Sequence, residues 1–301
     1  MNDAFDSLND FKFSTAYEFF VAPADRDYLF ARWLFINGFP EFFWHASQAV
    51  EKYLKAGLVL NGEKLKKGNH DIESLYKKHC QIFDTLAFKC FTKPLELSVE
   101  FWRDSTVDLF VKRINDMGNP DSRYGLVSWH RRNCDLFKFD QLCWHLRRLT
   151  IGLNWNVNED FPCEPAIKRF AGKTYREVLT ENPTAQPRGT IGNLTKTIVG
   201  TGPLMSDLFH AWNFEFLRDE VDLSKAIPNS LKPQLGPFKN SILFLYWKAL
   251  TQTDSSGALL GLSENFKDGM QWLVSSIKLN TDLEKEIRAK LEVKRTGRSA
   301  L

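Results

Sequence analysis

The hydrophobic and polar positions follow the helical period along most of the chain, and most clearly from Pro40 to Gly62. In this stretch apolar side chains fall on one face of a helix and polar side chains form a stripe on the other. Pro40 suits a first helical turn, and Gly62 can adopt the left-handed conformation that ends a helix. The apolar face is Phe42, Phe43, Ala46, Ala49, Val50, Tyr53, Leu54, Gly57 and Leu60, and the polar stripe is Glu41, His45, Gln48, Lys52 and Lys55.

The same period predicts helices before and after this one. Asp25 can cap a helix that runs to about Asn37, and a third helix begins at His70-Asp71. A fourth amphipathic pattern covers Leu95 to about Met117, and a fifth covers Asp135 to Leu149. Toward the carboxyl terminus, helical patterns cover residues 204–216, 240–251, 257–278 and 281–294.

The segments without a helical period suggest how the chain is divided. Residues 1–24 predict an irregular lead-in, and residues 151–165 are rich in Asn and Pro and predict a linker. Residues 181–204 contain Gly and Pro throughout and predict a long loop. We therefore expect an all-α protein with a helical bundle over residues 25–150, a linker, and a second, mostly helical domain over residues 166–301.

Composition narrows the class of protein only slightly. The 301 residues are 43% hydrophobic and 14% aromatic, which is typical of a folded chain, and the net charge of +3 does not decide for or against nucleic acid. Five scattered cysteines without a C-x-x-C pair favour reduced thiols in a cytosolic protein and no zinc site. The acidic amino terminus lacks an apolar core, and Ser241–Trp247 is far shorter than the roughly 20 residues of a membrane span. We expect a cytoplasmic protein that does not enter a membrane.

Known catalytic and cofactor motifs are not evident in the sequence. The glycines at 189–192 and 200–202 lack the spacing of a phosphate-binding loop, and no H-E-x-x-H motif or nucleophile elbow occurs. We therefore predict no cofactor and no metal site.

A family resemblance comes from the Pro40–Gly62 helix and its neighbours. The segment His45–Ala56 reads HASQAVEKYLKA. It is preceded by Asp27-Tyr28 and followed by His70-Asp71-Ile72. This order resembles the HEPN domain family, whose hallmark is HA-x-QA-x-EK-x-LKA followed by His-Asp and a hydrophobic residue. The resemblance covers about half of the chain. It implies an up-and-down bundle of four to five helices, often dimeric, that acts in RNA cleavage, RNA or nucleotide binding, toxin–antitoxin pairs or antiviral defence.

Ribonucleases of that family carry an Arg, commonly followed by a polar residue, and a His after four to six further residues. An imidazole can exchange a proton with a 2′-hydroxyl while an arginine holds the phosphate, so this chemistry needs no metal. Arg132-Asn133 lies where the motif would begin, but Phe137, Lys138 and Phe139 occupy the positions of the histidine. Arg123 and His130 match the spacing, and His145 lies one turn before Arg148 on the fifth predicted helix. The candidate catalytic residues are Arg123, His130, Arg132 and His145.

Local charge points to nucleic acid more directly than the motif does. Residues 123–150 contain six Lys or Arg and two Asp, a net of +4, with Trp and Phe interleaved. Such a mixture can hold phosphates and stack bases, although a helix with its aromatic side chains in the core and its arginines in solvent gives the same pattern. The candidate nucleic-acid-binding residues are Arg131, Arg132, Asn133, Arg147 and Arg148.

Three functional hypotheses follow. The leading one is a HEPN-like module that binds RNA or a nucleotide in a stress, toxin–antitoxin or antiviral defence system, without a hydrolytic centre of its own. The second is a metal-independent endoribonuclease, and the third is a protein–protein interaction module. A homodimer or a cognate partner protein is compatible with each of them.

Overall fold

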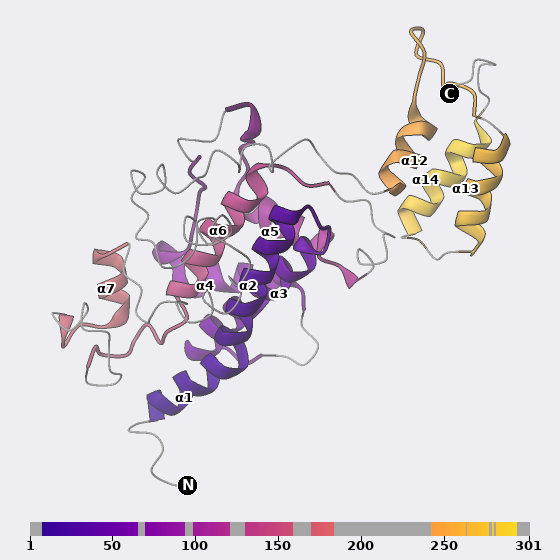
Figure 1. Cartoon of the computed structure of the whole chain (residues 1–301). Coiled ribbons are helices and arrows are strands. Elements are labelled where there is room, and N and C mark those ends of the chain that lie inside the picture. The colour runs from indigo at the N-terminus through magenta and orange to yellow at the C-terminus, as the bar shows by residue number, and fades with distance from the viewer. Residues whose placement is uncertain are drawn as a thin grey trace. The chain divides into compact units, whose positions relative to one another are not determined.

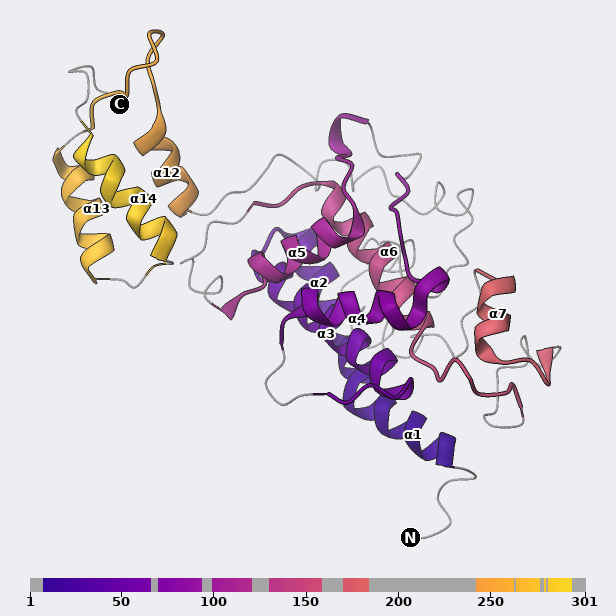
Figure 2. The same cartoon turned by 180° about the vertical axis from the view of Figure 1, so that it is seen from behind.

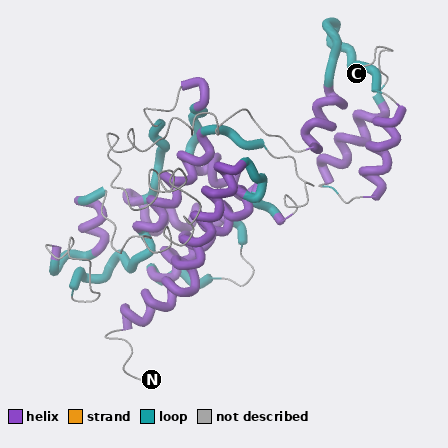
Figure 3. The backbone as a smooth tube through the Cα atoms, viewed as in Figure 1, coloured by secondary structure: helices purple, strands orange, loops and turns teal. Residues whose placement is uncertain are grey.

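The computed structural model of the chain is mostly helical in the part that it describes, with loops between the helices (Figures 1 and 3). The structure describes residues 8–65, 70–93, 99–120, 130–158, 170–183, 242–262, 264–276, 279 and 281–293. Within these ranges the chain forms no strand, only two isolated β-bridges, so the expected all-α fold class is confirmed. The described residues group into two compact units, one formed by residues up to Gly118 and from Arg132 to 183, the other by 242–293 with the ends of the 119–131 segment.

The first unit is built around α3 (Phe42–Leu60), the helix with the clearest sequence pattern. It packs against α2 (Ala22–Asn37), α4 (Ile72–Phe83), α5 (Val107–Met117) and α6 (Cys134–Arg148), and Figures 1 and 2 show these helices gathered together. Every residue of its predicted apolar face is buried. The expected helices at 25–37, 40–62 and 135–149 are therefore found as α2, α3 and α6, and the helix expected to begin at His70-Asp71 is found as α4.

Aromatic side chains join three of these helices in the core. The ring of Phe42 on α3 lies edge-on to Phe35 of α2, with centroids 5.0 Å apart, and edge-on to Phe139 of α6, at 5.5 Å. Tyr28 of α2 lies 5.4 Å from the same Phe139 ring. Edge-to-face aromatic pairs add roughly 0.5–1.5 kcal/mol beyond the area they bury, so this cluster helps to fix α2, α3 and α6 against one another.

The amino-terminal segment differs from its prediction. Instead of an irregular lead-in, residues 8–24 form α1 (Leu8–Ala16), the π-helix η1 (Tyr17–Val21) and the first turn of α2. Phe13, Ala16 and Val21 bury their side chains, and the first two of them join a core cluster with Leu60, Phe83 and Leu149. The sequence pattern of this segment is weak because only a narrow apolar face is buried.

The segment after α6 also differs from its prediction, because residues 151–157 pack into the first unit. Ile151, Leu153, Trp155 and Val157 are buried, and the chain turns between Gly152 and Trp155, where the Trp155 N–H donates to the Gly152 carbonyl at 3.2 Å. The backbone of this segment pairs with the start of α7 (Tyr175–Glu181), which lies at the edge of the unit in Figures 1 and 2. The expected linker over 151–165 is therefore wrong for its described residues.

Asn61 fastens this segment to the end of α3. Its amide nitrogen donates to the carbonyl oxygens of Gly57, at 2.8 Å, and Ile151, at 2.9 Å. Its carbonyl oxygen accepts from the backbone N–H of Leu153 at 2.9 Å. The residue that the sequence assigns to a helix end therefore also joins two segments that are far apart in the chain.

The fourth predicted helix is shorter than expected. Of residues 95–117, only Val107–Met117 form α5, while Val99–Phe101 form a 3-10 turn and 94–98 lie outside the described residues. The Thr106 hydroxyl accepts from the Leu109 N–H at 3.3 Å and so caps α5 at its amino end. This cap starts the helix about a dozen residues later than the apolar pattern suggests.

The second unit contains α12 (Ile242–Thr251), α13 (Glu264–Ser276) and α14 (Thr281–Glu292) around a core of its own. Leu250, Met270 and Ile287 are buried, one from each helix. Outside the core, the Trp247 indole donates to Glu286 at 2.9 Å and Arg288 donates to the Val274 carbonyl at 2.9 Å. The predicted helices over 240–251, 257–278 and 281–294 are thus found, the second of them starting later than expected. The predicted helix over 204–216 and all but the first three residues of the 181–204 loop lie outside the described residues.

Candidate nucleic-acid interface

Arg147, predicted to contact nucleic acid, is part of the interior. Its guanidinium donates to both carboxylate oxygens of Asp25 on α2, at 2.9 and 3.1 Å, and both side chains are nearly fully buried. The Tyr53 hydroxyl of α3 donates to the same carboxylate at 2.6 Å. Burial opposes the charge of Arg147, but the Asp25 carboxylate outweighs it and raises the pKa of the guanidinium. This arginine links three helices and does not lie on a surface that RNA could reach.

Arg148 is also buried. Its guanidinium donates to the carbonyl oxygens of Leu179, at 2.9 Å, and Asn182, at 3.2 Å, which ties α6 to the end of α7. Burial lowers the pKa of Arg148 to about 10. The prediction that Arg147 and Arg148 form a nucleic-acid surface is therefore wrong, because helical spacing does not reveal that α1, α2 and α7 cover this end of α6.

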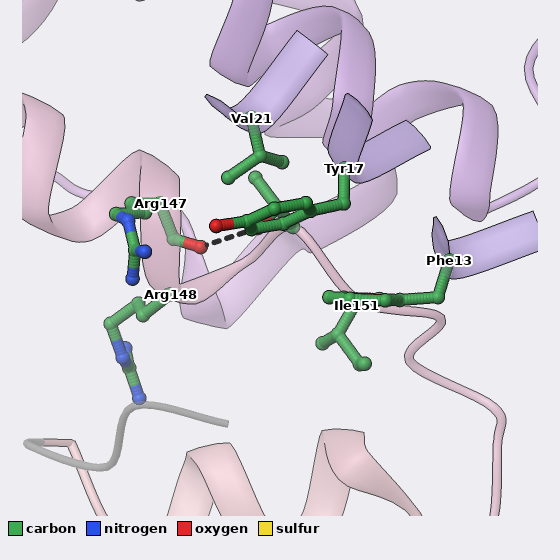
Figure 4. Close-up of a pocket in the computed structure, with 7 residues that line it drawn as sticks. Phe13, Tyr17, Val21, Arg147, Arg148 and Ile151 are labelled. Carbon is green, nitrogen blue, oxygen red and sulfur yellow. Dashed lines mark hydrogen bonds between the residues drawn. The ribbon is translucent and has the colours of Figure 1, made fainter. Parts of the chain in front are cut away.

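Figure 4 shows the space around these two arginines. Arg147 and Arg148 lie on one side of a pocket, and Phe13, Tyr17, Val21 and Ile151 line the rest of it. The enclosed volume is about 10 Å³, the room of roughly one water molecule. The pocket is too small for a nucleotide.

A second buried ion pair joins α2 and α6. Arg32 Nε lies 3.3 Å from Asp140, with both side chains fully buried, and the Tyr28 hydroxyl donates to Asp140 at 2.7 Å. Burial, and then the nearby Asp140 charge, raise the pKa of Tyr28 well above its usual value. The charged residues on this face of α6 thus serve the packing of the bundle.

His145 lies in the last turn of α6, away from the amino end of that helix. Its ring stacks on Phe88 with centroids 4.1 Å apart and meets the Trp144 ring edge-on at 4.8 Å. Eleven residues of helix, roughly 16 Å, separate it from Cys134 at the start of α6. His145 and Arg132 are therefore too far apart to act on one phosphate.

The other candidates lie before α6. Arg123 falls outside the described residues, His130 is half-buried and Arg131 is buried. Asn133 is the residue before the first turn of α6, and its side chain makes no capping hydrogen bond there.

Arg132 is the candidate that the structure places in a suitable environment. It is half-buried next to the first turn of α6, its backbone N–H donates to Asp135, and its Nε is buried without a hydrogen-bond partner. Burial, and then repulsion by Arg113 and Arg103, lower the pKa of this guanidinium. An anion beside the accessible part of this guanidinium would relieve the repulsion.

Three further basic residues surround Arg132, and we call Arg103, Arg113, Arg132 and Lys138 the cationic cluster. Arg103 and Arg132 are its accessible members, whereas Lys138 is buried and the Arg113 side chain is only 10% exposed. Arg113 forms a bidentate pair with Asp135, with N–O distances of 3.2 and 2.8 Å. The Lys138 ammonium donates to the Arg103 carbonyl and, at 2.7 Å, to the Ser105 hydroxyl. These contacts hold the segment 103–105 against the first turns of α6, and the exposed side chain of Arg103 lies close enough to Arg132 to repel it.

Aromatic side chains accompany the cationic cluster. The Lys138 ammonium lies 5.0 Å from the Trp102 ring centroid and 5.4 Å from that of Phe91. Phe101, next in sequence to Trp102, is 47% exposed. Cations and aromatic rings close together are typical of surfaces that bind phosphates and stack single-stranded bases.

Sequence reasoning missed Phe101, Trp102 and Arg103. It assigned Phe101 and Trp102 to the apolar pattern of a helix over 95–117, whereas they lie in and after a 3-10 turn before α5. The Asp104-Ser105-Thr106 sequence is rich in residues that cap helices, and it is the signal that could have placed the start of the helix later. Phe101 and Trp102 would then have been predicted to lie outside the helix.

The polar residues that carry the family resemblance form two ion-pair clusters on α3. Asp27 of α2 accepts from Lys52 and lies 3.0 Å from His45 Nδ1. Burial alone would raise the pKa of the Asp27 carboxyl, but the hydrogen bonds from His45 and Lys52 outweigh burial and lower it. Glu51, itself buried, pairs with Lys55 at 2.6 Å and with His70 at 3.1 Å. The polar stripe of α3 is thus half-covered and paired rather than simply solvated.

Nowhere in the described ranges do three or more His, Cys, Asp or Glu side chains gather as metal ligands would. Among the helices that the structure describes, none is long and apolar enough to span a membrane.

Comparisons of the chain with protein-family models, with curated proteins and with solved structures give no significant match. The relation to the HEPN family therefore rests on the residues quoted above, and it stays a prediction.

Proposed function

We propose that the chain is a HEPN-like module that binds single-stranded RNA through the cationic cluster, as part of a stress, toxin–antitoxin or antiviral defence system. The observation that carries the proposal is the half-buried Arg132 guanidinium, which lies beside Arg103 and Arg113 at the amino end of α6. A phosphate would offset the repulsion among these cations, and Phe101 and Trp102 offer rings on which bases can stack. The proposed module binds RNA without cleaving it.

Titration of a labelled single-stranded oligoribonucleotide across a salt series tests this proposal. Arg132→Ala removes one phosphate contact, so the slope of log K against log salt becomes shallower by about 0.7. Phe101→Ala removes a stacking partner for a base, so the binding free energy becomes weaker by roughly 1–3 kcal/mol while the slope of log K against log salt stays the same.

Arg26→Ala is the matched control, because Arg26 is exposed on α2 and carries the same charge. It should change neither affinity nor slope. Equal effects of Arg26→Ala and Arg132→Ala would show that binding follows net charge alone and would contradict the assignment to the cationic cluster. Cyclic-phosphate ends on the RNA after incubation in chelator would favour the endoribonuclease instead, with His130→Ala as its test.

A further inference from the structure

A second cation-lined space lies between α3 and α4, formed by residues from both helices and from the chain between them. Its volume is about 100 Å³, ten times that of the pocket in Figure 4. This is room for several water molecules, but far less than the roughly 300 Å³ or more of a pocket that takes a whole drug-sized ligand. The space therefore suits one small group. Its lining includes Lys55, Lys64 and Lys78, with Glu63, Ser74 and Leu75.

The charges of this pocket favour an anion. Three ammonium groups and one carboxylate line it, and Glu51, which pairs with Lys55, brings the sum over these five groups to +1. Lys64 is exposed and forms no ion pair or hydrogen bond in the structure. Lys55, in contrast, is 13% exposed and held at 2.6 Å from Glu51, so its ammonium is fixed in place.

The remaining lining residues fit the same ligand. Lys78 pairs with Glu63, but both side chains are partly exposed, and such pairs contribute at most about 1 kcal/mol. An incoming anion can therefore redirect Lys78 at little cost. Ser74 lies in the first turn of α4, where the helix dipole favours negative charge and a hydroxyl can donate to an anion.

We infer that this pocket binds a terminal phosphate group, that is, a phosphomonoester. A phosphomonoester carries about −1.5 to −2 charges and has one substituent, so it can enter a small pocket end-on. A phosphodiester continues in two directions, so it fits a pocket of about 100 Å³ less readily than a group with one substituent. The inference does not rest on the proposed RNA binding, because the phosphomonoester can belong to a free nucleotide or to an RNA end.

Calorimetric titration of the full chain tests the inference, with AMP compared with adenosine and a 5′-phosphorylated oligoribonucleotide compared with its 5′-hydroxyl form. AMP should bind and adenosine should not. Lys78→Ala should lower the affinity for AMP roughly tenfold, because it removes one charge-assisted hydrogen bond. Lys77→Ala is the matched control, since Lys77 is exposed on the same helix and does not line the pocket. Lys64→Ala, at an exposed position after α3, repeats the test without risk to folding.

The oligonucleotide pair identifies the source of the phosphate. If the 5′-phosphate strengthens RNA binding and Lys78→Ala removes only that difference, the ligand is an RNA end; if only AMP responds, it is a free nucleotide. Arg132→Ala should weaken both oligonucleotides alike, so failure of the RNA-binding proposal can be told apart from failure of this one. Equal binding of AMP and adenosine together with equal binding of the two oligonucleotides, or equal effects of Lys77→Ala and Lys78→Ala, would overturn the inference.

Discussion

His79 of α4 is a buried histidine without a partner. The side chain is 1% exposed, neither ring nitrogen has a hydrogen-bond partner, and the ring stacks on Phe83 with centroids 4.2 Å apart. Burial in this apolar surrounding lowers the pKa of His79 from 6.5 to about 3. Between about pH 6.5 and pH 3 the imidazole of His79 is therefore neutral in the folded protein, whereas in the unfolded chain it is protonated.

This histidine should make the fold sensitive to acid. Below pH 6.5 the unfolded chain binds a proton that the folded chain does not, so stability is complete above pH 6.5 and falls as pH drops toward 3. The expected loss is about 1.4 kcal/mol for each pH unit, or about 2 kcal/mol between pH 6.5 and 5. His79→Leu should remove this part of the pH dependence in urea unfolding.

Lys77→Leu is the control for this change, because it alters the exposed side of the same helix. It should leave the slope of stability against pH as it is. If His79→Leu unfolds with the same pH slope as the wild-type chain, His79 does not titrate on unfolding.

At the same scale, the limits of sequence reasoning are clearest at the arginines of α6. The sequence gives no reason to distinguish Arg132, Arg147 and Arg148. In the structure Arg132 is half-buried among cations, Arg147 is buried against Asp25, and Arg148 is buried against backbone carbonyls. The difference depends on which distant segments cover each end of the helix. Only the three-dimensional contacts of α1, α2 and α7 supply that information.

Whole elements were easier to predict than the roles of single side chains. The apolar face of α3 could be read directly because all of its members point into one core. The amino-terminal helices could not, because their burial depends on Leu60, Phe83 and Leu149, which are distant in sequence. The alternating Ile151, Leu153, Trp155 and Val157 carry a period-2 signal that the Asn and Pro content of the region concealed.

Two glycines show how closely the elements pack and give opposite predictions. A Cβ on Gly118, at the end of α5, would lie 2.6 Å from Ser47 Cβ and 2.7 Å from the Phe43 carbonyl oxygen, both on α3. Because Cβ and backbone atoms of a buried helix cannot move aside freely, Gly118→Ala should cost about 1–3 kcal/mol of stability. Gly269, within α13, has nothing within 4 Å of its Cβ position, so Gly269→Ala should stabilise its unit by about 0.5–1 kcal/mol.

Thermal unfolding of both variants measures this contrast. A gain in stability for Gly118→Ala would mean that α5 does not approach α3 as closely as these distances require. A loss for Gly269→Ala would mean that the exposed face of α13 is covered.

At the scale of the whole molecule, each of the two units buries a core of its own within the described residues. Leu149 is fully buried in one and Leu250 in the other. We expect two transitions in calorimetry, with Leu149→Ala lowering the stability of one and Leu250→Ala that of the other, each by about 2–5 kcal/mol. A single transition, or a shift of both by either change, would show that the units unfold together.

The contacts of Asn61 have a practical consequence for anyone who divides this chain into parts. A truncated protein that ends at residue 150 would lose two hydrogen bonds, the one that Asn61 donates to the Ile151 carbonyl and the one that Asn61 accepts from the Leu153 N–H. It would also uncover Leu60, Phe83 and Leu149, which those residues help to bury. Such a fragment would expose a hydrophobic surface, and it would precipitate or bind other proteins without specificity. A fragment intended for binding studies should therefore extend to at least residue 183, so that α7 is retained.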